Sequence, residues 1–93
     1  MLLPVSEGQA HFASAQFWDC YDNSSEFVRM RADKQFALLK EDPSHPSLHF
    51  KRVGRYLSAR VSDDVRVLGV AIEGGILWFW MGRHDEYSRM IRR

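Results

Sequence analysis

The sequence has little of what marks secreted and membrane-bound proteins. It contains one cysteine, Cys20, so no disulfide can form within the chain, and a reducing compartment is the expected environment. No apolar run approaches the roughly twenty residues that a membrane-spanning helix needs, and no basic segment followed by a long apolar stretch opens the chain. These absences predict one small cytoplasmic domain over residues 1–93, in which residues 1–12, with Pro4 and Gly8, form a lead-in.

Net charge is nearly absent as well, at +1, but the two halves of the chain differ in sign. Residues 1–47 carry four basic and seven acidic side chains, whereas residues 48–93 carry nine basic and five acidic ones. A basic half of this kind is typical of polyanion binding, and it is equally compatible with an ordinary solvated surface. Charge alone leaves both alternatives open.

The N-terminal half predicts two helices joined by a short turn. The first, over residues 15–21, follows a candidate cap at Ser14. The second begins where Asn23 and Glu26 have capping-box spacing, and it ends at Asp42, which precedes a proline. Its apolar face recurs at intervals of four, four and three residues, at Val28, Ala32, Phe36 and Leu39. Helices with so short a connection are expected to pack antiparallel.

The C-terminal half changes to short β-type runs separated by turn signals. Four strands are predicted, at residues 48–53, 56–61, 65–72 and 76–81, with a further short strand near His11. The turns are short enough only for hairpins, and the paired helices must cover one face of the resulting sheet. The predicted fold is α+β: an N-terminal helical hairpin packed on an antiparallel sheet of about four to five strands, followed by a short C-terminal helix at residues 85–93.

The last predicted strand carries the most informative pattern. Its run from Ile76 to Met81 is wholly apolar, which favours a strand buried on both faces. An imidazole, two carboxylates and a phenol follow, at His84, Asp85, Glu86 and Tyr87. Because a buried strand holds its end rigidly, these groups are expected to be positioned as a site. The alternative is that Asp85 and Glu86 only cap the start of the last helix, where carboxylates are favoured.

Basic side chains recur on or between the predicted strands. The set consists of Lys51, Arg52, Arg55, Arg60 and Arg66. Adjacent strands lie about 5 Å apart, so these side chains can converge on one patch, where guanidinium groups would bind phosphate oxygens in a two-pronged geometry. The simpler alternative is a solvated sheet face. Asp63 and Asp64, in the turn between Arg60 and Arg66, would neutralise part of the patch.

Several short sequence segments, taken in their order along the chain over roughly residues 14–91, form a recognisable pattern. They are Phe17-Trp18, Ala32-Asp33-Lys34, Phe36 to Pro43, His45 to Lys51, Tyr56, Arg60, and Ile76 to Trp80 running into His84 to Tyr87. This set resembles the RelE/ParE superfamily of bacterial type II toxins, and the resemblance implies a helical hairpin over a curved antiparallel sheet. The chain differs from the family pattern at Ser62 to Val65, where a glycine turn and a tyrosine are more frequent, and at Leu57, where a tryptophan is frequent.

The resemblance implies a toxin that is encoded beside an antitoxin and neutralised by it. RelE-like members cleave mRNA in the ribosome without a metal, so a metal-independent endoribonuclease with no cofactor and no metal site is expected. ParE-like members instead poison DNA gyrase, and a catalytically silent nucleic-acid- or partner-binding module of the same fold is a third alternative. No membrane partner is expected.

The resemblance also implies roles for particular residues. Arg66 and Arg60 would hold the phosphate, and His84 or Tyr87 would move protons, since an imidazole titrates near neutral pH and a phenol suits the acid role. The flanking RNA backbone would be bound by Lys51, Arg52, Arg55 and Arg83.

The aromatic residues of the last strand alternate along the chain and are expected to point to opposite faces of the sheet. Core packing is the simpler prediction for them. Two helices cannot cover both faces, however, so Trp78 and Trp80 are candidates for an exposed patch that binds the antitoxin. Cys20 is expected to be a small buried hydrophobic residue.

Overall fold

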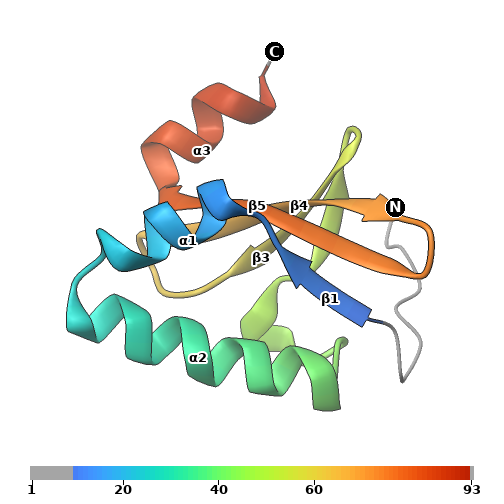
Figure 1. Cartoon of the computed structure of the whole chain (residues 1–93), viewed down its shortest axis with the longest axis horizontal. Coiled ribbons are helices and arrows are strands. Elements are labelled where there is room, and N and C mark those ends of the chain that lie inside the picture. The colour runs from blue at the N-terminus through green and yellow to red at the C-terminus, as the bar shows by residue number, and fades with distance from the viewer. Residues whose placement is uncertain (1–9, 93) are drawn as a thin grey trace.

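The computed structural model describes residues 10–92, which form five strands and three α-helices around a central sheet. In chain order the elements are β1 (Ala10–Ala13), α1 (Ala15–Asp22), α2 (Glu26–Glu41), the short 3-10 helix η1 (Pro46–Leu48), β2 (Lys51–Val53), β3 (Tyr56–Arg60), β4 (Val65–Ile72), β5 (Gly75–Arg83) and α3 (His84–Ile91). Figure 1 shows α2 on one side of the sheet and α3 on the other, which confirms the predicted α+β class. The first nine residues of the predicted lead-in, with Pro4 and Gly8, lie outside the described residues. No helix in the described part of the chain combines the length and the hydropathy needed to cross a membrane.

The strands form one sheet in the order β1-β5-β4-β3-β2. From β2 to β5 the neighbours are the predicted antiparallel hairpins, with Arg60 on β3 directly opposite Arg66 on β4. The prediction of a purely antiparallel sheet is wrong at one edge, because β1 pairs with β5 in parallel, beginning with Ala10 opposite Gly75. Parallel strands need a long crossover connection, and here the whole chain between β1 and β5 supplies it.

Both N-terminal helices begin at a serine. The Ser14 hydroxyl accepts a hydrogen bond from the Phe17 N–H, as predicted, and the Ser25 hydroxyl accepts one in the first turn of α2. The prediction that Asn23 caps α2 is wrong, because Asn23 ends α1 and its side-chain amide donates back to a carbonyl of that helix. α2 ends just before Asp42, as predicted.

The sheet packs against different side chains on its two faces. Toward α1 and α2 the buried residues are Ala32, Leu39, Leu48, Phe50, Leu57, Ala59, Val61, Val65, Ile76, Trp78 and Met81. Toward α3 the cluster is smaller and consists of Leu68, Trp80 and Tyr87, with Met90 and Ile91 packed against it. The predicted apolar face of α2 is therefore buried only in part: Ala32 and Leu39 lie in the core, whereas Phe36 is 42% exposed.

A β-bulge in β5 separates its aromatic residues. The register with β4 shifts so that Trp78 is opposite Gly69 and Trp80 is opposite Leu68, which leaves Phe79 without a partner. Trp78 consequently packs with the α1–α2 cluster, while Phe79 and Trp80 both pack with the α3 cluster. The prediction of strict alternation across the sheet is wrong because the bulge inserts one residue. Gly69 is required at this position, since a Cβ there would lie 2.8 Å from the Trp78 ring.

Candidate active site

The centre of the candidate site is a pair of arginines on neighbouring strands. Arg60 and Arg66 are opposite one another in the β3–β4 ladder, so both side chains leave the same face of the sheet. Each is half-buried. The pKa of Arg66 lies below its usual value, first because burial removes water from the guanidinium and second because Arg60 places a like charge beside it. An anion that contacts both guanidinium groups would relieve this repulsion, so the pair is suited to a phosphate.

The turn after β3 already engages both arginines. Arg60 forms an ion pair with Asp63, whose side chain is 91% exposed. The Arg66 Nη1 donates to the carbonyl oxygens of Ser62 at 2.6 Å and of Asp63 and Val65 at 3.2 Å each. Arg66 therefore stabilises the turn through hydrogen bonds to its carbonyl oxygens. The Arg60 guanidinium, in contrast, is paired with an exposed carboxylate that an external anion could replace.

The start of α3 adjoins this turn. The His84 N–H donates to the Asp64 carbonyl oxygen at 2.6 Å, which ties the end of β5 to the β3–β4 turn. The His84 side chain is exposed, and its ring centroid lies 5.6 Å from that of Tyr87. Tyr87 itself is 5% exposed, and its hydroxyl accepts a hydrogen bond from the Ser58 hydroxyl at 2.9 Å.

These contacts distinguish the two groups predicted to move protons. The fold brings His84, Tyr87 and both arginines to one end of the sheet. Only His84 is accessible to a ligand, because the Tyr87 ring is packed among Leu68 and Trp80. Tyr87 is placed to hold α3 and the His84 ring rather than to contact a substrate.

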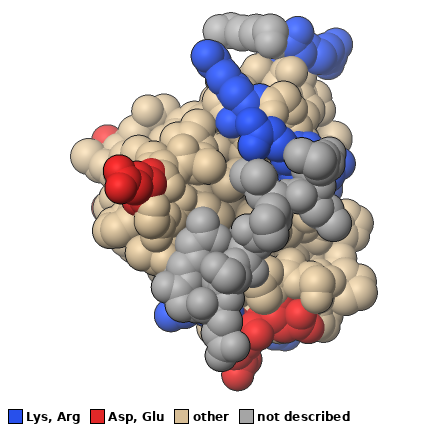
Figure 2. All heavy atoms as spheres, turned by 90° about the vertical axis from the view of Figure 1, so that its right-hand side faces the viewer, with Lys and Arg blue, Asp and Glu red and all other residues tan. Residues whose placement is uncertain are grey.

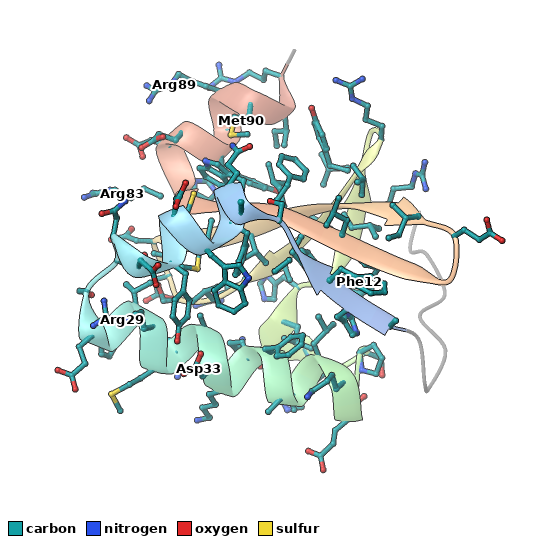
Figure 3. The ribbon with its side chains drawn as sticks, viewed as in Figure 1. Phe12, Arg29, Asp33, Arg83, Arg89 and Met90 are labelled. Atoms are coloured by element: carbon teal, nitrogen blue, oxygen red, sulfur yellow. The ribbon has the colours of Figure 1, made fainter. Side chains whose placement is uncertain are left out.

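Three further charged residues surround His84. Arg83 precedes α3 as its N-cap residue, is exposed, and extends away from the end of β5 in Figure 3. Asp85 and Glu86 are exposed in the first turn of α3, where the helix dipole favours carboxylates. Their placement matches the helix-start role given above as the alternative.

The remaining predicted basic residues lie at the other end of the strands, in the β2–β3 hairpin. Lys51 is exposed and opposite Ser58, so it shares the sheet face of the site. Arg52 donates through its Nε to the Gly54 carbonyl at 3.0 Å, and Arg55 lies over the Tyr56 ring at 5.3 Å from its centroid. On the face of the molecule in Figure 2, most of the visible Lys and Arg atoms lie in the upper part, with fewer at the lower left, whereas Asp and Glu lie at the left and at the bottom. The hairpin thus carries a second group of basic side chains, separate from the arginine pair at the opposite end of β3.

A second feature, on the opposite face of the sheet, is an apolar groove of about 290 Å³ between β1, α1 and α2. Its aromatic lining comes from Phe12, Phe17, Trp18, Tyr21, Phe36 and Trp78. Figure 3 shows Phe12 on β1 and Asp33 on α2, which lie on its two sides. The Tyr21 hydroxyl donates to the Asp33 carboxylate at 2.7 Å and so joins α1 to α2; this hydrogen bond is the main reason that the pKa of Tyr21 lies above its usual value.

The two tryptophans predicted to bind the antitoxin, Trp78 and Trp80, are both buried. Trp78 is 5% exposed, lies in the core toward α1 and α2 and forms part of the lining of the groove, while Trp80 is 7% exposed and lies in the α3 cluster. The bulge in β5 and the packing of α3 bury them. Around the groove, the exposed aromatic surface is formed instead by Phe12 and Trp18, each 50% exposed, and by Phe36.

Sequence reasoning missed two buried polar residues next to the site, Ser58 and Gln35. Ser58 stands alone as a polar residue in an apolar stretch of β3. The Gln35 amide donates to the carbonyls of Arg60 at 3.0 Å and Ser47 at 3.3 Å, which links α2 to the strand that carries Arg60. The signal for Gln35 was its spacing, three residues after Ala32 and therefore on the buried side of α2.

No protein-family model matches the sequence, and no curated protein matches it. Solved structures do resemble it. A chain in the RelB–RelE antitoxin–toxin complex from Methanococcus jannaschii has a TM-score of 0.66 at 11% identity, with 85% of this chain and 96% of that chain covered. YafQ from E. coli strain BL21(DE3) gives 0.64 at 14% identity, covering 85% and 97%. The isolated E. coli RelE toxin gives 0.58 at 13% identity, covering 89% and 95%. The chain therefore shares the fold of these RelE and YafQ structures.

Proposed function

We propose that this protein is the toxin of a type II toxin–antitoxin pair and that it cleaves mRNA on the ribosome. The observation that carries the proposal is the Arg60–Arg66 pair on one sheet face, next to the exposed His84 at the start of α3. The likeness in fold to RelE and YafQ supports the same hypothesis. Such a protein would act in the cytoplasm, where mRNA is translated.

The proposed chemistry needs no cofactor. The ribose 2′-hydroxyl attacks the adjacent phosphorus, the bond to the 5′-oxygen breaks, and the products are a 2′,3′-cyclic phosphate and a 5′-hydroxyl end. Arg60 and Arg66 stabilise the negative charge on the phosphorane. His84 carries one of the two proton transfers, and Tyr87 holds its ring in place. Lys51, with Arg52 and Arg55, binds the flanking backbone.

Induced expression followed by mapping of mRNA 5′ ends tests the proposal. The wild-type protein is expected to halt translation and to leave new 5′ ends within transcripts. His84→Ala should lower cleavage by about 10²- to 10⁴-fold, the usual contribution of a positioned acid or base. Arg89→Ala is the matched control, because Arg89 is an exposed basic residue of the same helix. Intact transcripts during growth arrest would reject the proposal, and a DNA-damage response in their place would favour the gyrase alternative.

One observation favours the catalytically silent alternative. Both guanidinium groups are engaged within the chain, Arg60 by Asp63 and Arg66 by three carbonyl oxygens. A module that only binds a nucleic acid or a partner would be harmless on induction, with intact mRNA, and would retain binding to RNA in vitro. The same induction experiment separates this alternative from the endoribonuclease.

The partner that we propose is an antitoxin whose apolar segment binds in the groove between β1, α1 and α2. Three of the similar structures are complexes of a toxin with its antitoxin, one of RelB–RelE and two of DinJ–YafQ. The exposed aromatic side chains around the groove, Phe12, Trp18 and Phe36, provide the contiguous apolar surface that a docking site needs.

A further inference from the structure

Ser58 is a polar side chain in the middle of the core. It lies at the centre of β3 and is 2% exposed, between the buried residues Leu57 and Ala59. A hydroxyl removed from water in this way is destabilising unless it forms a hydrogen bond. Its partner is the hydroxyl of Tyr87, at 2.9 Å, which is itself buried. The hydrogen bond joins the sheet to α3, across 29 residues of chain.

The bond acts on the part of α3 that carries His84. Tyr87 is in the first turn of the helix, and its ring centroid lies 5.6 Å from that of His84. The same turn is held at a second point by the backbone hydrogen bond from His84 to Asp64. One anchor comes from the turn between β3 and β4 and the other from the body of β3, so together they fix both the position and the rotation of the turn. Without the Ser58 hydroxyl, the hydrogen bond to Tyr87 is lost, and only the backbone hydrogen bond from His84 to Asp64 still holds the turn.

We infer that Ser58 is a positioning residue of the site: through the Tyr87 hydroxyl it fixes the first turn of α3 and so places the His84 imidazole at the end of the sheet that carries Arg60 and Arg66. The inference rests on the proposed endoribonuclease function. Ser58 does not contact RNA, since both members of the hydrogen bond are buried beneath α3.

The position of Ser58 separates its effect on rate from its effect on binding. The arginine pair is held by the β3–β4 ladder, and the backbone hydrogen bond from His84 to the β3–β4 turn does not involve Ser58, so the KM for mRNA should be unchanged in Ser58→Ala. The rate constant for cleavage should fall by about 10- to 100-fold, because a small displacement of a catalytic group has an effect of this size. Tyr87→Phe should produce the same loss. The double variant should be no slower than either single variant, since both remove one interaction.

The experiment measures cleavage of an mRNA by the purified full chain in the presence of ribosomes, over a range of mRNA concentrations. The set comprises wild type, Ser58→Ala, Tyr87→Phe, the double variant, Ser58→Thr and Ser88→Ala. Ser58→Thr keeps a hydroxyl at the same position and should recover most of the rate. Ser88→Ala removes a hydroxyl from α3 outside the Ser58–Tyr87 pair and should retain wild-type activity. Losses that multiply in the double variant, or a loss confined to KM, would overturn the inference.

A second measurement keeps the inference independent of catalysis. Hydrogen exchange of the α3 amides should accelerate equally in Ser58→Ala and Tyr87→Phe, and the NMR resonances of the His84 ring should shift in both. Hydrogen exchange of the sheet amides should be unchanged. If wild type cleaves no mRNA, the proposed function fails, and these spectra alone decide whether Ser58 positions His84. Unchanged α3 exchange and unchanged His84 resonances in both variants would overturn it. Tyr87→Phe retains the packing of the ring, so it serves if Ser58→Ala does not fold.

Discussion

Replacement of Asp63 by Asn should strengthen RNA binding, because Asp63 occupies the guanidinium that we assign to the phosphate. The Arg60–Asp63 ion pair is solvent-accessible, with side chains 29% and 91% exposed. Pairs of this kind contribute about 0.2–1 kcal/mol. An RNA phosphate no longer has to displace the carboxylate in Asp63→Asn, so the Kd should fall by about 1.4- to 5-fold through the loss of this competition.

Asp64→Asn is the matched control for this change. It removes the same unit of negative charge from the same turn, and both carboxylates lie near Arg66. Asp64 contacts His84 through its backbone carbonyl, which the substitution retains. General attraction of the polyanion should therefore rise equally in the two variants, and the additional gain in Asp63→Asn measures the freed Arg60.

Fluorescence anisotropy with a labelled single-stranded RNA, at several salt concentrations, measures both quantities. Freeing one guanidinium for a phosphate should steepen the dependence of log Kd on log salt by about 0.7 relative to Asp64→Asn. Equal affinities and equal salt slopes for the two variants would refute the reasoning, since Arg60 would then be no more available without its internal partner. Circular dichroism confirms that both variants are folded before they are compared.

Three other predictions concern the opposite face of the molecule. The pKa of His11 is lowered, first by burial and second by a neighbouring lysine. As the pH drops below 6.5, the unfolded chain therefore binds a proton at His11 before the folded chain does. The free energy of unfolding should fall over this range, down to the pKa of His11 in the folded protein. Urea denaturation should show this slope in wild type and lose it in His11→Gln; a slope of the same size in both would contradict the assignment. Gly75→Ala should lower the free energy of unfolding by about 1–3 kcal/mol, because the added Cβ would overlap the Ala10 backbone and push β1 from the sheet; an unchanged urea midpoint would contradict it. Trp18→Ser should weaken binding of the proposed antitoxin by about tenfold or more in calorimetry, while leaving the proposed mRNA cleavage by the free protein intact; unchanged affinity would remove the groove from the interface.

Local signals in the sequence were enough for the hairpins. The strand predicted at residues 65–72 is β4 without change, and that at residues 56–61 is β3 with one residue in excess, since alternation and turn residues act over short distances. The strand predicted from Leu48 begins later, at Lys51. Pro46 opens a 3-10 turn there, and the His45 ring accepts a hydrogen bond from the Ser47 N–H, so Leu48 enters the core from a turn.

The site was predictable where it depended on a hairpin and unpredictable where it depended on how a helix docks. Arg60 and Arg66 face each other because one tight turn separates their strands. Tyr87 is buried and His84 exposed, although they are three residues apart, because α3 packs one side of its first turn on Trp80. The register shift that gives Trp78 and Trp80 different surroundings depends on the close approach of β4, which no pattern within β5 reveals.

The parallel pairing of β1 with β5 also sets an order of assembly. β1 is the first of the described strands to leave the ribosome, yet its partner residues at 75–78 are synthesised after every other strand segment of the sheet. Closing so long a loop is entropically unfavourable until the intervening hairpins have shortened it. The three antiparallel pairings should therefore form first, and β1 should join last. Until then the edge of β5 is open, and the groove that β1 helps to line does not yet exist. The surface that we propose for the antitoxin therefore forms only after the arginine pair is already in place.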